Sequence, residues 1–203
     1  AASQKLSDTK INDLDVTEPS DVADKAAQDL SNNSVIGWFT GRCEVGPRAL
    51  GNRSILSNPI KGENWKRVNS IKSREEWRPF APAVLEEEAH HWFGGAPLPS
   101  PYMLFTANVK KPNDIPAVTH VDGSARVQTV SKNSGPFRHV LEGFHKYTRT
   151  PILLNTSFNG PGEPIVDRPK EAIDLFLKND LDVLYLSGVR ITKRKNNAVT
   201  SEE

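Results

Sequence analysis

Basic side chains gather in one part of this chain, where they could bind a phosphate ester. Residues 42–78 hold nine Arg or Lys against four Glu, a local charge of +5, whereas the whole chain of 203 residues carries only +1. A concentrated positive field suits an anionic ligand, although a solvated basic helix face would give the same composition. The segments that present these cations therefore come first.

A glycine-rich turn over residues 41–54 follows the first strongly apolar stretch. Its two leading glycines have the spacing of a P-loop, but Pro47 and Arg48 stand where that motif needs Lys and Ser or Thr. Proline has no N–H to offer a phosphate, so the sequence excludes a P-loop. What remains is a rigid turn that presents Arg48 and Arg53 as two-pronged donors to an anion. In the alternative, these arginines pair with Glu44 and solvent in a structural turn.

A second set of cations lies in residues 72–82. Lys72 is predicted to end a helix, and Arg78 stands between Trp77 and Pro79, which would stiffen its backbone. A cation held in this way loses little ordering entropy when a ligand binds. Alternatively, a basic helix end serves only to complement the helix dipole.

A third segment, residues 119–128, combines a turn with a predicted strand. Strand alternation places Ser124 and Arg126 on one face, and an arginine on an inward face needs an anion. An exposed strand edge is the alternative. His120, just before the turn, is a candidate acid–base residue, although a lone histidine can equally be structural.

A fourth segment is the polar, Gly/Pro-rich loop that follows the apolar strand at residues 151–154. Its small side chains, Asn155, Ser157 and Asn159, could read a nucleotide or a urea-like group beyond the strand end. The alternative is a structural Asx or ST turn. The five histidines lack metal-ligand spacing, so no metal held by the protein is expected. Cys43 is predicted to be a small buried residue rather than a nucleophile.

Alternating helices and strands are predicted to position these segments. Apolar residues at helical spacing predict helices over residues 20–30, 65–71, 86–93, 137–147 and 169–177. Ser20 is a plausible N-cap for the first of these helices. Apolar runs predict strands at 35–39, 83–85, 102–109, 125–130, 151–154 and 183–186. We therefore expect an α/β fold with one mixed sheet. Residues 1–18 are expected to form a loose arm or linker, 19–190 the domain and 191–203 a flexible tail.

The overall composition excludes several classes of protein. A single Cys excludes a disulfide framework and a cysteine zinc site. No apolar run approaches the roughly 18 residues of a membrane span, and no signal-peptide pattern opens the chain, so a cytoplasmic protein without membrane contact is expected. A net charge of +1 and 7% aromatic residues argue against a nucleic-acid partner.

Five ordered blocks of sequence resemble one known family. They read GRCEVGPRALGNRSIL, REEWRPFAPAVLEE, SPYMLF, IPAVTHVDGSARVQTV and PILLNTSFNGPGEPIV. Across residues 35–188 the chain is similar to the C-terminal domain of NodU/CmcH-type O-carbamoyltransferases. The resemblance implies a YrdC-like α/β domain with a mixed twisted sheet and flanking helices.

The resemblance also implies an activity and its partners. In that family this half takes carbamoyl phosphate and ATP, with Mg²⁺ on the nucleotide, and forms carbamoyl adenylate with release of phosphate and pyrophosphate. A separate N-terminal domain carries a histidine-bound metal and passes the carbamoyl group to an acceptor hydroxyl. We therefore expect that domain, or a separate chain, as a partner, and family members often form homodimers.

Residue by residue, the resemblance implies two sets of site residues. The catalytic set is Lys72, Arg126 and Arg48. The substrate- and nucleotide-binding set is Arg78, Arg53, Ser124, His120, Asn155, Ser157 and Asn159. Two alternatives stay open: a non-catalytic module that binds nucleotide or RNA, and a partner subunit that only completes an interface.

Overall fold

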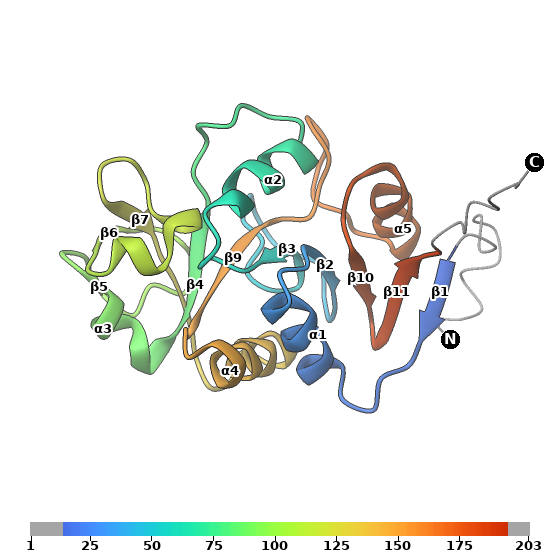
Figure 1. Cartoon of the computed structure of the whole chain (residues 1–203), viewed down its shortest axis with the longest axis horizontal. Coiled ribbons are helices and arrows are strands. Elements are labelled where there is room, and N and C mark those ends of the chain that lie inside the picture. The colour runs from blue at the N-terminus through green and yellow to red at the C-terminus, as the bar shows by residue number, and fades with distance from the viewer. Residues whose placement is uncertain (1–13, 195–203) are drawn as a thin grey trace, which may run out of the picture.

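Two β-sheets and the helices around them make up residues 14–194, the part of the chain that the computed structural model describes (Figure 1). The main sheet is mixed, because the pairs β10–β2 and β4–β8 are parallel and the others antiparallel. In spatial order its eight strands are β1 (Leu14–Thr17), β11 (Val189–Lys193), β10 (Val183–Leu186), β2 (Ile36–Phe39), β3 (Arg53–Ser57), β9 (Ile152–Ser157), β4 (Ala81–Leu85) and β8 (Gln128–Val130). The expected mixed α/β fold is confirmed.

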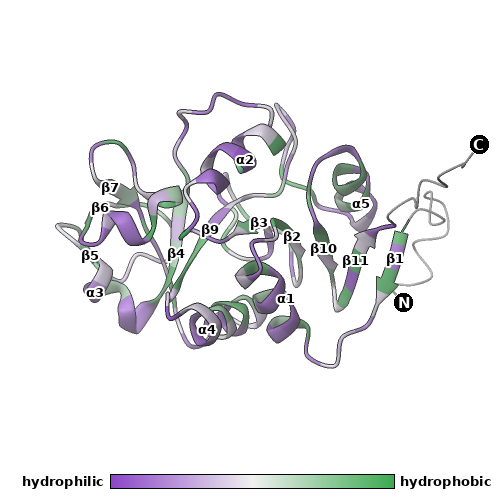
Figure 2. Cartoon of the chain, in the orientation of Figure 1, coloured by the Kyte–Doolittle hydropathy of each residue, from purple (hydrophilic) through white to green (hydrophobic). Residues whose placement is uncertain are grey.

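Helices cover both faces of the main sheet and create two cores. Helices α1 (Val22–Ser31) and α4 (Pro136–Thr148) pack on one face, and α2 (Glu63–Ile71) and α5 (Pro169–Lys178) on the other. Side chains alternate between these cores along β9, where Leu153 faces α1 and α4 while Ile152 and Leu154 face away. Figure 2 shows both hydrophilic and hydrophobic residues on each of the longer helices, as one-sided burial requires. Helix α1 is capped by Asp21, one residue after the predicted cap.

A second, three-stranded sheet lies beside the end of the main sheet (Figure 1). It contains β5 (Phe93–Gly94), β6 (Thr106–Val109) and β7 (Ser124–Arg126). The prediction of one sheet and of one strand over residues 125–130 was therefore wrong. The chain leaves the small sheet after Arg126 and joins the main sheet at Gln128, while buried Val127 donates its N–H to the carbonyl of Phe105. An apolar run shows that a strand forms, but it does not show that the strand changes partner halfway.

Short helical elements connect these strands. They are the 3-10 turns Glu86–Glu88, Pro112–Asp114 and Pro116–Val118, and helix α3 (Ala89–Trp92). The predicted helix over residues 86–93 is thus a 3-10 turn followed by one turn of α-helix.

Both ends of the described chain belong to the main sheet. The sequence predicted a loose arm up to residue 18 and a tail from residue 191, but β1 and β11 pair with each other from Leu14–Lys193 to Thr17–Arg190. Each strand at this edge carries polar side chains on its solvent side, so its composition resembles that of a loop. The remaining residues of the predicted arm and tail, 1–13 and 195–203, lie outside the described part.

Replacing Gly51 with alanine is expected to lower the free energy of unfolding by about 2–4 kcal/mol. Gly51 has a φ of +115°, and a Cβ there would overlap the ring of Phe137 on α4. Urea unfolding of the variant measures the loss. The matched control is Gly62→Ala, because a Cβ there meets Pro116 at 3.7 Å and the backbone needs no positive φ. Equal stabilities for the two variants would contradict this account.

Candidate functional site

The topology of the main sheet brings the four basic and polar segments together at the strand ends where β9 finishes and β3 and β4 begin. The end of β9 lies between the starts of two antiparallel neighbours: Ser157 pairs with Ser54 on β3, and Asn155 pairs with Ala81 on β4. Strand β8 begins beside β4, and the glycine-rich turn connects β2 to β3. Lys72 caps the C-terminal end of helix α2, and its side chain reaches the end of β9. Residues far apart in sequence therefore meet here.

Three adjoining pockets of about 300, 120 and 380 Å³ form a cleft at these strand ends. Arg74 lines all three, so we treat them as one site and call it the basic cleft. Its cationic lining consists of Arg48, Lys72, Arg74, Arg78 and Arg126. Among the lining residues of the three pockets, Glu75 alone is a carboxylate. Such a lining attracts a polyanion and focuses the positive field in the cleft.

Lys72 is the most deeply buried of these cations, with 6% of its surface exposed. Its Nζ donates to Oδ1 of Asn159 and to the carbonyl of Ser157, both at 2.7 Å. Within residues 14–194 no carboxylate forms an ion pair with it. Burial, followed by the positive charge of Arg74, lowers the pKa of Lys72 to about 7. Two predicted binding residues, Ser157 and Asn159, thus hold the ammonium of Lys72 through a backbone carbonyl and a side-chain amide oxygen.

Arg74 is a cleft residue that the sequence analysis did not select. Its Nε donates to Oδ1 of Asn69 at 2.7 Å, and its guanidinium lies 4.5 Å from the ring centroid of Phe80. Burial and the nearby Arg78 lower its pKa to about 10. In the described chain its two terminal nitrogens have no hydrogen-bond partner, so they are available to an anion. Its position two residues after Lys72 was the signal that could have revealed it.

Arg48 and Arg126 line the smallest part of the cleft. Nε of Arg126 is buried and has no hydrogen-bond partner. Burial, followed by the positive charge of Arg48, lowers the pKa of Arg126. A half-buried guanidinium beside a second positive charge forms a place where an anion is favoured.

Arg78 lies at the exposed rim, with its Nε 3.1 Å from Glu75. Its backbone is fixed, but not by the neighbours that the sequence suggested, because Trp77 is 71% exposed. Instead, Nε1 of Trp65 and Nδ2 of Asn69 donate to its carbonyl at 2.6 and 3.0 Å. The rigid backbone was expected, and its cause lies in α2.

Two predicted ligand residues do not line the cleft. Arg53 is buried under the glycine-rich turn, where its guanidinium lies 3.6 Å from the ring centroid of Phe39 and donates to the carbonyls of Thr40, Asn52 and Gly41. Ser124 donates to Oδ1 of Asp122 at 2.6 Å. Both side chains hold loops in place.

His120 lines the basic cleft, whereas Cys43 does not. His120 lines its largest part, and burial lowers the pKa of this imidazole. Its Nδ1 lies 3.2 Å from Oγ of Ser124. Cys43, which the sequence analysis predicted to be buried, is exposed because the turn around it faces solvent.

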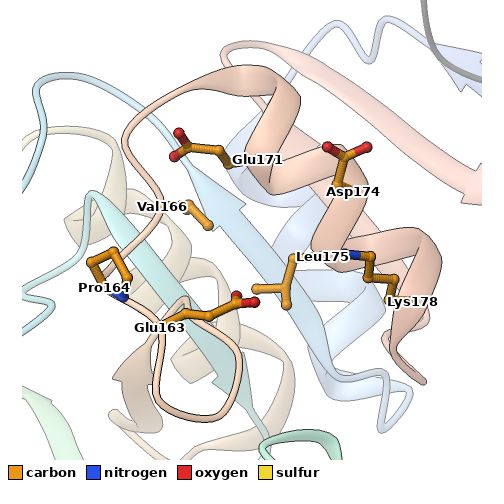
Figure 3. Close-up of a pocket in the computed structure, with 7 residues that line it drawn as sticks. All are labelled: Glu163, Pro164, Val166, Glu171, Asp174, Leu175 and Lys178. Carbon is orange, nitrogen blue, oxygen red and sulfur yellow. The ribbon is translucent and has the colours of Figure 1, made fainter.

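A separate groove of about 250 Å³ runs between α5 and the loop that precedes it (Figure 3). Its charged lining is three carboxylates, Glu163, Glu171 and Asp174, with Lys178. This charge is of the wrong sign for a polyanion, so the groove does not compete with the basic cleft as a phosphate site. Among the described residues, no group of His, Cys, Asp and Glu could hold a metal ion, and no helix is long and apolar enough to cross a membrane.

A comparison with known families identifies the family of this chain. Residues 27–193 match the model of the family described as Carbamoyltransferase C-terminus. The chain belongs to this family. The resemblance drawn from the five sequence blocks is therefore confirmed.

Relatives in the carbamoyltransferase family are much longer than this chain. Nodulation protein NolO of Bradyrhizobium diazoefficiens is 48% identical over 190 residues, which are 89% of this chain and 34% of that protein. The 3'-hydroxymethylcephem-O-carbamoyltransferase of Amycolatopsis lactamdurans is 40% identical over 151 residues, 74% of this chain and 29% of that protein. The chain thus spans about a third of these curated relatives.

Solved structures share the fold of this carbamoyltransferase domain at low sequence identity. The structure of full-length HypF in its phosphate- and nucleotide-bound form matches this chain with a TM-score of 0.59 at 19% identity. The matched region is 85% of this chain and 22% of the HypF chain. The structure of P. abyssi Sua5 complexed with L-threonine matches this chain with a TM-score of 0.56 at 12% identity. The matched region is 82% of this chain and 46% of the Sua5 chain. The likeness confirms the expected YrdC-like architecture.

Proposed function

We propose that the basic cleft binds carbamoyl phosphate and ATP and forms carbamoyl adenylate. The observation that carries this proposal is the set of buried or half-buried cations, Lys72, Arg74 and Arg126, that face one cleft without a carboxylate partner. Buried charges normally have partners, so a ligand must supply the missing anions. The phosphate- and nucleotide-bound form of the similarly folded HypF, and the carbamoyl transfer named for the cephem relative, support this choice of ligand.

The reaction consumes one water and balances as follows. Water attacks the phosphorus of carbamoyl phosphate, the bond from phosphorus to the carbamoyl oxygen breaks, and carbamate and phosphate result, with the proton of the water passing to phosphate. A carbamate oxygen then attacks the α-phosphorus of ATP and displaces pyrophosphate. Carbamoyl adenylate, phosphate and pyrophosphate are the products.

The cations of the cleft would act by position and charge. Arg48 and Arg126 would hold the carbamoyl phosphate in the smallest part of the cleft, and Lys72 would neutralise the α-phosphate during attack. Arg74 lines every part and would bridge the two ligands, while Arg78 and His120 would bind at the rim. Ser157 and Asn159 would orient Lys72. No nucleophilic side chain is needed, and Mg²⁺ bound to ATP would supply further neutralising charge.

Transfer to the final acceptor belongs, in this proposal, to an N-terminal domain or a separate chain. The chain spans only about a third of its curated relatives. The product of the cleft would be the activated carbamoyl donor for that partner.

Calorimetric titration with carbamoyl phosphate and Mg·ATP, combined with an assay for pyrophosphate, tests the proposal. We expect both ligands to bind, and pyrophosphate to appear only when both are present. Binding without pyrophosphate would limit the function of this chain to holding the ligands, with another domain completing the reaction. Failure of both ligands to bind would overturn the proposal.

A further inference from the structure

Asn159 and Gly160 form the single Asn-Gly pair of the chain, and they lie on the wall of the basic cleft. In such a pair the backbone nitrogen of the glycine can attack the side-chain carbonyl carbon of the asparagine, because glycine has no Cβ to obstruct the approach. The side-chain nitrogen then leaves as ammonia. This chemistry needs no ligand, so it is independent of the activity proposed above.

Two donors point at the oxygen atom on which charge would develop during that attack. Nζ of Lys72 and Oγ of Ser157 each lie 2.7 Å from Oδ1 of Asn159. As the nitrogen adds to Cγ, Oδ1 becomes an oxyanion, and donors that are already in place stabilise this charge. Because one of the donors is a cation, the stabilisation is stronger than two neutral groups would give.

The surrounding groups also fix the nitrogen atoms that attack and leave. Gly160 is buried, and its N–H donates no hydrogen bond within the described chain, so the attack breaks none. Nδ2 of Asn159 donates to the carbonyl of Glu163 at 2.7 Å. A carbonyl only accepts and an ammonium only donates, so the amide cannot be reversed between Glu163 and Lys72.

Packing requires that residue 160 remain a glycine. A Cβ at this position would lie 2.6 Å from Oε2 of Glu163 and 3.3 Å from Cδ1 of Leu175. The loop therefore keeps an Asn-Gly pair, and the 300 Å³ part of the cleft gives that pair access to water.

We propose that Asn159 deamidates spontaneously, and that its conversion to a carboxylate neutralises Lys72 and closes the basic cleft to polyanions. The nitrogen of Gly160 bonds to Cγ of Asn159, the bond from Cγ to Nδ2 breaks, and the amide proton of Gly160 leaves with the ammonia. Water then opens the succinimide and yields aspartate or isoaspartate. The sum consumes one water, releases one ammonia and needs no oxidant or reductant.

A carboxylate at position 159 would change the charge of the cleft beside Lys72. The oxygen that accepts from Nζ as part of a neutral amide would accept as an anion and form an ion pair. Lys72 would then have a carboxylate partner, and an incoming phosphate would have to compete with that negative charge. Deamidation would thus limit the lifetime of the cleft.

Peptide mass spectrometry of the full 203-residue chain, incubated without ligand in H₂¹⁸O, tests the reaction. Opening of the succinimide adds one labelled oxygen at the converted residue. The internal reference is Asn133, which is exposed and precedes a serine. We expect Asn159 to convert at least about tenfold faster than Asn133, since it has both the glycine and the two donors.

A pair of lysine variants tests the part played by the ammonium. Lys72→Met should slow conversion at Asn159 by about tenfold and leave Asn133 unchanged, because it removes the charged donor from Oδ1. The matched control is Lys66→Met, whose exposed side chain lies outside the lining of the cleft. It should alter neither rate.

Calorimetric titration with inorganic pyrophosphate tests the consequence for the cleft. Asn159→Asp should bind this polyanion at least about tenfold more weakly than the wild type. Asn133→Asp adds the same charge outside the cleft and should bind within about twofold of the wild type. If Asn159→Asp does not fold, an aged sample of the wild type takes its place, and the pyrophosphate bound per chain should fall by the fraction that carries the label.

Four results would overturn the inference. Conversion at Asn159 that is no faster than at Asn133, or that Lys72→Met does not slow, would overturn the reaction. Equal affinities of Asn159→Asp and the wild type for pyrophosphate would overturn its consequence. These three results leave the proposed function intact. Failure of the wild type to bind pyrophosphate would overturn the consequence and also count against the proposed function, and the ligand-free rates of conversion would distinguish this case from the others.

Discussion

Replacing Lys72 with methionine is expected to lower the rate of pyrophosphate release by about 10²–10³-fold and to leave the chain folded. The loss follows because Nζ is held at the cleft by Ser157 and Asn159 and, in the proposed function, neutralises the α-phosphate. The fold should survive because an ammonium that is buried without a carboxylate costs free energy, and methionine of similar length removes that cost. We therefore expect an unchanged or higher melting temperature.

The pH dependence of the wild type tests the same charge. Lys72 has a pKa of about 7 in the folded chain and an ordinary value of 10.5 when unfolded. Between these values the unfolded chain holds one more proton, so this residue makes the folded chain more stable as pH rises. A polyanion needs the protonated form, so its affinity should fall above pH 7, by up to about tenfold per pH unit. Lys72→Met should abolish both trends.

The control for Lys72→Met is Lys66→Met on the same helix. Lys66 is 72% exposed and lies 3.9 Å from Glu76, outside the lining of the cleft. Its loss should leave pyrophosphate release and the pH profile unchanged. If Lys72→Met unfolds while Lys66→Met does not, Lys72 is a structural residue and its catalytic role is wrong.

Replacing Arg74 with alanine is expected to reduce pyrophosphate release by about 10²-fold or more. Arg74 lines all three parts of the cleft, and Asn69 and Phe80 fix its guanidinium while both terminal nitrogens stay without a partner in the described chain. Arg74→Lys should recover only part of the rate, because one ammonium cannot reproduce two parallel donors. Steady-state pyrophosphate assays of the three proteins measure the order.

Arg42→Ala separates this local role from the loss of a positive charge. Arg42 is exposed on the glycine-rich turn and does not line the cleft, so its loss should change the rate by less than about twofold. If Arg42→Ala and Arg74→Ala slow the reaction equally, the general field matters and the geometry of Arg74 does not.

The sequence predicted the elements whose burial has a clear period. The stripe from Phe137 to Tyr147 became α4, and Trp65, Val68 and Ile71 became the inward face of α2. Strands β1 and β11 were missed because most of their side chains are exposed or half-buried. Strand β3 was missed because its residues, RSILS, resemble the turn that precedes them, although all five are buried.

The candidate site was predictable where a cation stands out in sequence and not where its role depends on distant partners. Lys72, Arg48 and Arg126 were selected, and all three line the cleft. Arg53 looked equivalent to Arg48, yet a ring and three carbonyls within 14 residues bind it elsewhere. The amide nitrogen of Asn155 donates to Gln128, 27 residues away, and to Ala49, 106 residues away, and no local pattern indicates either contact.

The pairing of β1 with β11 has a mechanical consequence. Leu14 and Lys193 are partners, so the two ends of the described chain leave the sheet at the same place and in antiparallel strands. A force that pulls these ends apart would open the pair one hydrogen bond at a time, like a zipper, rather than shear all of its bonds together. Strand β1 would therefore peel away first. The strands that carry the basic cleft lie three or more positions further into the sheet, so they would remain paired while β1 detaches.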